Sequence, residues 1–64
     1  MINKNNKIYI AGHNGMVGSA IIRKLRKNGI HNIVTRNQSD LDLTDQSSVR
    51  YFLKNEKPEY VVIA

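Results

Sequence analysis

Short apolar segments rich in strand-forming residues alternate along the chain with longer segments of mixed character. Residues 7–11 (Lys-Ile-Tyr-Ile-Ala) and 30–35 (Ile-His-Asn-Ile-Val-Thr) are dominated by such residues, and the first segment is followed by Gly12. Residues 60–64 (Tyr-Val-Val-Ile-Ala) are apolar throughout, as expected of a strand that helices cover on both faces of a sheet. The pattern predicts three β-strands at these segments.

Two of the longer segments have the spacing of amphipathic helices. Residues 16–28 place four apolar side chains on one face, and Gly29 stands where a helix C-cap requires a positive φ. The second helix begins after Thr44 or Asp45, either of which can act as its N-cap, and Pro58 ends it. The apolar faces consist of Val17, Ala20, Ile21 and Leu25 in the first helix and of Val49, Phe52 and Leu53 in the second.

The polar stretch between the second strand and the second helix contains two alternating leucines. Leu41 and Leu43 are compatible with a short additional strand, so the expected order is β-α-β-(β)-α-β. Strands that alternate with helices predict an α/β fold with parallel strands and right-handed crossovers. The chain stops at Ala64, inside the last predicted strand, and we therefore expect it to be a fragment.

Composition narrows the class of protein. The 64 residues include no Cys, which excludes a disulfide-stapled mini-protein and a cysteine-based zinc module, and no metal-binding set is predicted. The longest apolar runs are far shorter than the ~20 residues that span a bilayer. Residues 1–7 also lack the apolar core of a secretory signal. We expect a soluble, cytoplasmic protein.

Basic residues dominate the first half of the chain. Lys and Arg number 10 against 5 Asp and Glu, the net charge is +5, and no carboxylate precedes Asp40. Such a surplus suggests an anionic partner, which could be a nucleic acid, a membrane headgroup or a phosphorylated small molecule. A solvated basic helix face explains the same charges, so charge alone leaves these alternatives open.

A glycine-rich loop, residues 12–18 (Gly-His-Asn-Gly-Met-Val-Gly), lies between the first strand and the first helix. At the spacing G-x-x-G-x-x-G, Gly12 permits the sharp exit from the strand and Gly15 lets a pyrophosphate approach the backbone. Gly18 lets the helix pack close to the sheet. Free N–H groups and the dipole at the helix start attract phosphate. A tight turn alone needs only one or two of these glycines, so the loop predicts dinucleotide binding.

The position of this loop also refines the fold. It predicts an α/β protein that is the N-terminal part of a Rossmann-type doubly wound parallel sheet, incomplete at its end. We divide the chain into residues 1–6, an Asn-rich and disordered N-terminus, and residues 7–64, a partial NAD(P)-binding Rossmann domain truncated in the last strand. At the crest of the loop, His13 and Asn14 have no carboxylate nearby in the sequence, which favours a loop-shaping or phosphate-adjacent role.

The end of the second strand indicates which dinucleotide is bound. NAD-selective folds usually carry an acid there, whereas this strand leads into Arg36 and no acid occurs before Asp40. Because Arg can hold phosphate oxygens bidentately, it favours the 2′-phosphate of NADP over NAD. A surface role for Arg36 with loose selectivity is the alternative. Further along, Asp42 and its apolar neighbours could flank the adenine, whereas Asp45 is better explained as a helix cap.

Residues 7–21 (Lys-Ile-Tyr-Ile-Ala-Gly-His-Asn-Gly-Met-Val-Gly-Ser-Ala-Ile) closely resemble the opening of the GDP-L-fucose synthases, a family of extended short-chain dehydrogenase/reductases. The string Gly-His-x-Gly-Met-Val-Gly-Ser-Ala is distinctive, because related sugar-nucleotide enzymes usually carry a loop of the type Gly-Gly-x-Gly-Phe-Ile-Gly. Residues 34–36, 41–44 and 57–62 extend the likeness, which runs from residue 7 to residue 64 but covers only the opening of a family enzyme.

The resemblance implies an NADP-dependent oxidoreductase and isomerase of nucleotide-sugar biosynthesis. Such an enzyme converts GDP-4-keto-6-deoxy-mannose into GDP-L-fucose by epimerisation at two carbons and reduction of the keto group. It also implies that the glycine-rich loop binds the NADP pyrophosphate and that residues 38–43 lie along the adenosine. The implied cofactor-binding residues are Gly12, His13, Asn14, Gly15, Met16, Val17, Gly18, Arg36, Gln38, Leu41, Asp42 and Leu43.

This chain departs from the family at two positions. Many members carry Arg where Asn14 stands, and some carry a second Arg where Gln38 stands. Both are implicated in holding the 2′-phosphate, so their absence leaves Arg36 as the main candidate for that contact.

The resemblance places the family's catalytic residues beyond Ala64: a Ser, a Tyr-x-x-x-Lys pair, and the Cys and His of the epimerisation. Tyr9, Tyr51 and Tyr60 are not substitutes, because no Lys follows any of them at the required spacing. We therefore assign no catalytic residue and expect the chain alone to be inactive. For the complete enzyme the resemblance implies a nucleotide-sugar substrate, a homodimer, and neither nucleic-acid nor membrane partners. The alternatives are a small basic anion- or nucleic-acid-binding module and a non-functional remnant.

Overall fold

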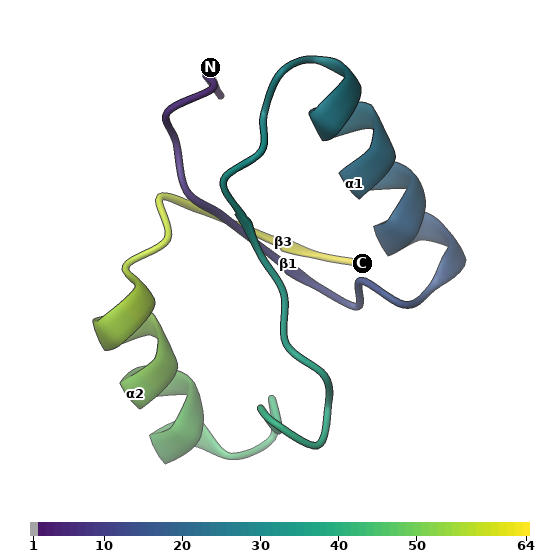
Figure 1. The fold of residues 1–64 in the computed structure, drawn as a ribbon. Helices are drawn as coiled ribbons and strands as arrows, with labels where there is room; N and C mark the ends of the chain where they lie inside the picture. Colours follow the sequence, from purple (N-terminus) through teal and green to yellow (C-terminus); the bar gives the residue numbers. More distant parts are fainter. Residues whose placement is uncertain (1) are drawn as a thin grey trace.

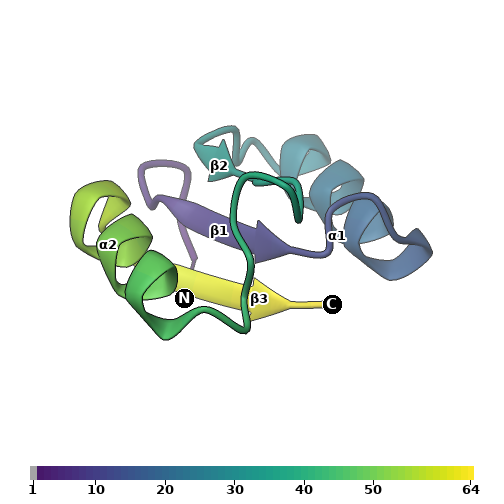
Figure 2. The same ribbon diagram turned by 90° about the horizontal axis from the view of Figure 1, so that it is seen from below.

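The structure is a computed structural model and describes residues 2–64. A three-stranded parallel sheet carries one helix on each face (Figure 1 and Figure 2). The strand order is β2-β1-β3, so the first strand lies in the centre (Figure 2). Figure 2 shows α1 and α2 on opposite sides of this sheet. The predicted incomplete Rossmann-type α/β fold is confirmed. The elements are β1 (Ile8–Ala11), α1 (Met16–Lys27), β2 (Ile33–Val34), α2 (Gln46–Glu56) and β3 (Tyr60–Ile63).

The alternation of side chains along β1 creates two cores. Ile8 and Ile10 are fully buried on the α1 side, where they pack with Ile22 and Ile30. Tyr9 points to the opposite face, because successive side chains of a strand alternate between the faces of a sheet. On that face the α2-side cluster consists of Tyr9, Ala11, Leu41 and Phe52.

One predicted cap is present on each helix, at the C-terminus of α1 and at the N-terminus of α2. Gly29 has φ +85° and follows the C-cap of α1. Asp45, rather than Thr44, caps α2, and one carboxylate oxygen accepts the amides of Ser47 and Ser48 at 3.1 and 3.3 Å. Neither helix in residues 2–64 combines the length and apolar character needed to cross a bilayer.

The second strand is shorter than predicted. Only Ile33 and Val34 pair with β1, whereas residues 30–35 were expected to be strand. The amide of Ile30 donates to the Leu25 carbonyl at 2.9 Å, so this residue closes the end of α1 and its side chain enters the core. Ile30 therefore belongs to the end of α1 and not, as the sequence pattern predicts, to the second strand.

The possible extra strand at Leu41 and Leu43 is wrong for the described residues. The amide of Leu41 bonds to the carbonyl of Asn37 at 3.0 Å in a turn, and no strand pairs with this stretch in residues 2–64. Leu41 is buried and Leu43 is half exposed, so the alternation marks an inward and an outward side chain without a sheet. We name residues 35–45, which connect β2 to α2, the crossover segment.

Strand β3 forms where the sequence predicts a strand. The expectation that helices cover both of its faces is wrong within residues 2–64. All four residues of β3 pair in parallel with β1, from Ile8 with Tyr60 to Ala11 with Ile63. Yet Val61 is 49% exposed and Ile63 is 78% exposed. The two helices pack against the central strand, and β3 is left at the edge.

The N-terminal residues that the structure describes make a turn. The amide of Asn6 donates to the Asn3 carbonyl at 3.1 Å, and the side chain of Asn6 donates to Glu59. Ile2 packs against the α1-side core. Met1, part of the predicted disordered segment 1–6, lies outside the described residues, and that assignment stays a prediction.

Candidate functional site

Two glycines of the loop are required by backbone packing. Gly12 has φ +85°, and a Cβ added to it would lie 2.8 Å from the carbonyl oxygen of Ala64. A Cβ on Gly18 would lie 2.0 Å from the carbonyl oxygen of Gly12, closer than any real contact. Helix α1 thus packs directly on the backbone of the turn that leaves β1, which is the close approach that the sequence analysis expected of Gly18.

Gly15 has a different role from its two neighbours. Its backbone lies in the extended region at the N-cap of α1, and an added Cβ would make ordinary contact, at 3.5 Å, with the Gly12 carbonyl oxygen. The fold itself therefore tolerates a side chain here. The amide of Gly15 already donates to that same carbonyl at 3.1 Å, so one loop N–H is engaged by the protein itself.

The next three amides have no acceptor within the described part of the protein. Residues Met16, Val17 and Gly18 form the first turn of α1, where backbone N–H groups have no intrahelical acceptor. In the described part of the chain no side chain caps them and no backbone carbonyl accepts from them. The helix dipole places partial positive charge at this end of α1, and the first turn contains no acid that would neutralise it.

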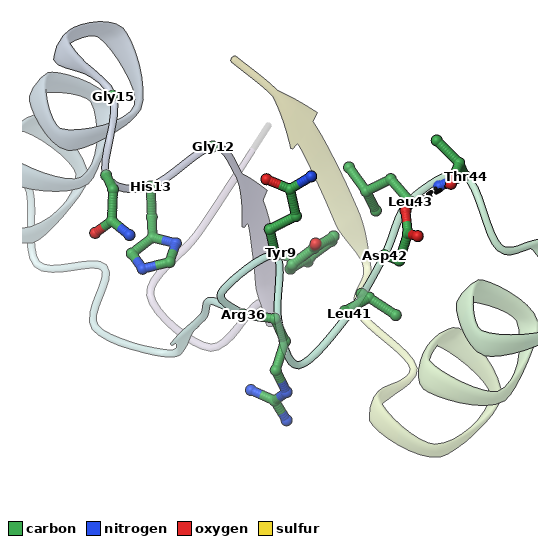
Figure 3. A pocket seen from close by; sticks show the side chains of 11 residues that line it. Tyr9, Gly12, His13, Gly15, Arg36, Leu41, Asp42, Leu43 and Thr44 are labelled. Atoms are coloured by element: carbon green, nitrogen blue, oxygen red, sulfur yellow. Dashed lines mark hydrogen bonds between the residues drawn. The ribbon is translucent and has the colours of Figure 1, made fainter.

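A hollow of about 340 Å³ opens between the glycine-rich loop and the crossover segment (Figure 3). It brings together nine of the predicted binding residues, from two parts of the sequence. Tyr9 and Thr44 also line it, although the sequence analysis did not select them. The nine are Gly12, His13, Asn14, Gly15, Arg36, Gln38, Leu41, Asp42 and Leu43.

Three predicted binding residues lie outside this lining. The side chains of Met16 and Val17 are 89% and 61% exposed, and Gly18 is buried beneath Gly12. None of the three lines the hollow. The assignment of all twelve residues to cofactor binding stays a prediction.

Arg36 is held by three groups of the protein. Its guanidinium donates to the Thr35 carbonyl at 2.7 Å and to Oε2 of Glu56 at 3.0 Å, and it lies over the ring of Phe52, 5.1 Å from the centroid. Figure 3 shows it directed away from Gly12 and Asp42. Glu56 also pairs with Nζ of Lys7 at 2.7 Å. The hydrogen bond from Lys7, together with the charges of Lys7 and Arg36, lowers the pKa of Glu56.

Asp42 is fixed within the crossover segment by a local turn. Its Oδ1 accepts from the hydroxyl and the amide of Thr44, at 2.7 and 2.9 Å. These two hydrogen bonds, the one from the side chain first, lower the pKa of Asp42, so the group is a carboxylate at neutral pH. An Asp two residues before a Thr is the sequence signal that could have found this turn.

Tyr9 forms part of the floor of the hollow. Its ring meets Phe52 edge to face, with centroids 4.6 Å apart, and it is 4% exposed. Burial raises the pKa of Tyr9 and the charge of Arg36 opposes that rise, so the phenol remains protonated at neutral pH. Its place on β1, facing away from α1, is the only sequence signal for this residue.

Two further observations complete the site. The side-chain amide of Asn14 donates to Oδ1 of Asn37 at 3.4 Å and so links the glycine-rich loop to the crossover segment. Across residues 2–64 no group of three or more His, Cys, Asp or Glu side chains could hold a metal ion.

Comparison with known proteins identifies relatives of the whole chain. Residues 8–64 match the model of the NAD dependent epimerase/dehydratase family. "Putative GDP-L-fucose synthase 2" of Arabidopsis thaliana is 55% identical over all 64 residues, which are 20% of that protein. GDP-L-fucose synthase of Escherichia coli (strain K12) is 41% identical over 58 residues, 91% of this chain and 18% of that protein. The resemblance to GDP-L-fucose synthases is confirmed, and the chain spans about a fifth of the length of these relatives.

Solved structures agree in fold and in kind of protein. A GDP-mannoheptose C4 reductase from Campylobacter jejuni with NADP bound has a TM-score of 0.95 and 45% identity over the whole chain, which covers 19% of that protein. A structure titled "DdhaC" has a TM-score of 0.97 and 50% identity over the whole chain, which covers 18% of it. These similarities concern the segment that contains both the glycine-rich loop and the crossover segment.

Proposed function

The chain belongs to the NAD dependent epimerase/dehydratase family, and we propose that it binds NADP as part of a sugar-nucleotide epimerase/reductase. The observation that carries the proposal is the hollow at the carboxyl ends of β1 and β2, where the loop and the crossover segment face each other. Ligands of open α/β sheets bind at this edge. Residues 7–64 are proposed to be a partial domain of a cytoplasmic protein.

The glycine-rich loop is the proposed diphosphate site. Gly15 can take a side chain without disturbing the fold, so its missing Cβ serves the approach of a ligand. The unpaired amides of Met16, Val17 and Gly18 supply donors at the positive end of α1. His13 lines the hollow beside them and stands next to the phosphates in this proposal.

The crossover segment is the proposed adenosine site. Leu41 and Leu43 offer apolar surface for the adenine, and the Asp42 carboxylate is an acceptor for its exocyclic amine. Gln38 and Arg36 lie at the opening of the segment, where the ribose 2′-position is expected. In the sequence, Arg36 follows β2 and no acid occurs before Asp40, which supports NADP rather than NAD.

For the complete protein we propose the synthesis of GDP-L-fucose from GDP-4-keto-6-deoxy-mannose, with NADPH as reductant and catalytic residues beyond Ala64. Relatives named GDP-L-fucose synthases support this product. The solved relatives named as GDP-heptose enzymes support the broader class of GDP-sugar epimerases and reductases. A homodimer is part of the same proposal.

Calorimetric titration of the protein with NADP⁺ and with NAD⁺ tests the cofactor assignment. We expect both to bind and NADP⁺ to bind more tightly. In Arg36→Met the affinity for NADP⁺ should fall roughly tenfold, as for the loss of a charge-assisted phosphate contact, while NAD⁺ binding stays within about twofold. Arg50→Met is the matched control, because Arg50 lies on α2 outside the hollow, where its guanidinium donates to Gln46. Binding of a polynucleotide without binding of either dinucleotide would refute the proposal.

A further inference from the structure

Three charged residues from three elements meet beside the hollow. Lys7 precedes β1, Arg36 follows β2, and Glu56 is the last residue of α2. One carboxylate oxygen of Glu56 pairs with Lys7 at 2.7 Å and the other pairs with Arg36 at 3.0 Å. The side chains are about one-third exposed, so solvent screens these pairs only in part.

The guanidinium of Arg36 is turned toward Glu56 and away from the glycine-rich loop. It lies across Phe52 and also lines a second hollow, of about 490 Å³, between the crossover segment and α2. Two of its donor nitrogens are used, one by the Thr35 carbonyl and one by Glu56. The guanidinium carries five N–H groups, so further donors remain, but the whole group is held over Phe52 and faces Glu56. Turning it toward a phosphate in the hollow beside the glycine-rich loop opens the pair with Glu56.

Glu56 and a ligand phosphate therefore compete for the orientation of the Arg36 guanidinium. Opening the pair leaves Glu56 hydrogen-bonded to Lys7, so its carboxylate is never without a cation. Lys7 thus lowers the free energy needed to release Arg36, because an unpaired, partly buried carboxylate is the unfavourable alternative.

We propose that Glu56 sets the preference for a ligand 2′-phosphate by competing for Arg36, and that Lys7 limits this competition. The inference rests on the proposed function, because it needs adenosine to bind with its ribose next to Arg36. Glu56 acts through Arg36 and is a positioning residue. Its competition reduces the discrimination that Arg36 provides between phosphorylated and unphosphorylated ribose.

Adenosine 2′,5′-bisphosphate and adenosine 5′-monophosphate are the probes, because they differ only in the 2′-phosphate. In Glu56→Gln, which keeps the shape and removes the charge, the ratio of the two affinities should rise about two- to fivefold, the range expected for one partly exposed ion pair. In Lys7→Met the same ratio should fall, because Arg36 is then the remaining cation for Glu56. Unchanged binding of the monophosphate shows that each variant is folded.

Two controls separate competition from a general effect of charge. Asp40→Asn removes a carboxylate that lines the same second hollow, and it should leave the ratio unchanged. In the Arg36→Met background, Glu56→Gln should have no effect, because the shared donor is gone. A lower ratio in Glu56→Gln, an equal gain in Asp40→Asn, or a gain that persists without Arg36 would each overturn the inference. A protein that binds neither probe would instead refute the proposed function and this inference with it.

Discussion

The two walls of the hollow are built in different ways. The glycine-rich loop is shaped by contacts of backbone on backbone, with Gly18 seated against the Gly12 carbonyl and Gly12 against the end of the chain at Ala64. The crossover segment is shaped by side chains: Asp42 bonds to Thr44, Arg36 to Glu56, and Leu41 packs into the core. The loop therefore accepts no side chain at Gly12 or Gly18, while each side-chain contact of the crossover segment can be removed separately.

The largest loss of stability is expected at Gly18, where the backbone of α1 contacts the backbone of Gly12. In Gly18→Ala the new Cβ would lie 2.0 Å from the Gly12 carbonyl oxygen, and neither partner is a side chain that could move. We expect a loss of stability above about 3 kcal/mol, beyond ordinary overpacking, measured as loss of the cooperative urea transition. Ser19→Ala, one residue later and only partly buried, is the control. If Gly18→Ala were as stable as the wild type, the contrast between a backbone-shaped loop and a side-chain-shaped crossover segment would be wrong.

A side chain that holds the crossover segment comes next. Leu41 is 6% exposed and packs with Tyr9, Ala11 and Phe52, so Leu41→Ala should destabilise the fold by about 2–3 kcal/mol. Leu43→Ala is the matched variant, because Leu43 is 51% exposed two residues later, and its effect should stay within about 1 kcal/mol. Equal losses in thermal unfolding would mean that the segment is not anchored at Leu41.

Gly15→Ala should separate binding from folding within the loop. The added methyl meets only the Gly12 carbonyl oxygen, at 3.5 Å, and a change at an N-cap lacking a side-chain hydrogen bond costs less than about 1 kcal/mol. Because the methyl enters the hollow, affinity for NADP⁺ should fall roughly tenfold, or about 1.4 kcal/mol, by calorimetry. If affinity is unchanged while stability falls, Gly15 serves the fold alone.

The smallest loss of stability is expected when the pH is lowered and Asp42 and Glu56 become protonated. The folded-state pKa values of Asp42 and Glu56 lie below their ordinary values of 3.8 and 4.5. Their contribution is therefore complete above those ordinary values and is lost as pH falls through the lower, folded values. An acid titration by NMR should move the Thr44 amide, and Asp42→Asn should abolish that shift. A Thr44 amide that moves equally in Asp42→Asn would exclude the turn as its cause.

The same difference between the walls decides what the sequence can predict. The glycine spacing revealed the loop, because the close backbone contacts at Gly12 and Gly18 each need a glycine and leave a visible pattern in the sequence. The capping roles of Asp45 and Gly29 were also predictable, because each depends only on the local geometry of a helix terminus.

Contacts between distant side chains leave no such pattern. Arg36 was selected as a phosphate ligand, but its pairing with Glu56 depends on where α2 ends relative to β2. Tyr9 was overlooked because its part in the hollow arises only when the crossover segment folds over β1. The extra strand at Leu41 and Leu43 failed because alternation records burial and says nothing about whether a neighbouring strand exists to pair with.

The parallel pairing of β1 with β3 has a consequence for the order of assembly. Lys7 and Glu59, joined by a hydrogen bond at the start of these strands, are 52 residues apart. Long chain closures of this kind form slowly, after local helices. Ala64, which follows β3, donates its amide to the Ala11 carbonyl at 3.0 Å and lies against Gly12, so the turn after β1 has all its contacts only when this last pairing is complete. A dinucleotide that requires that turn would then bind preferentially to chains in which the sheet has closed.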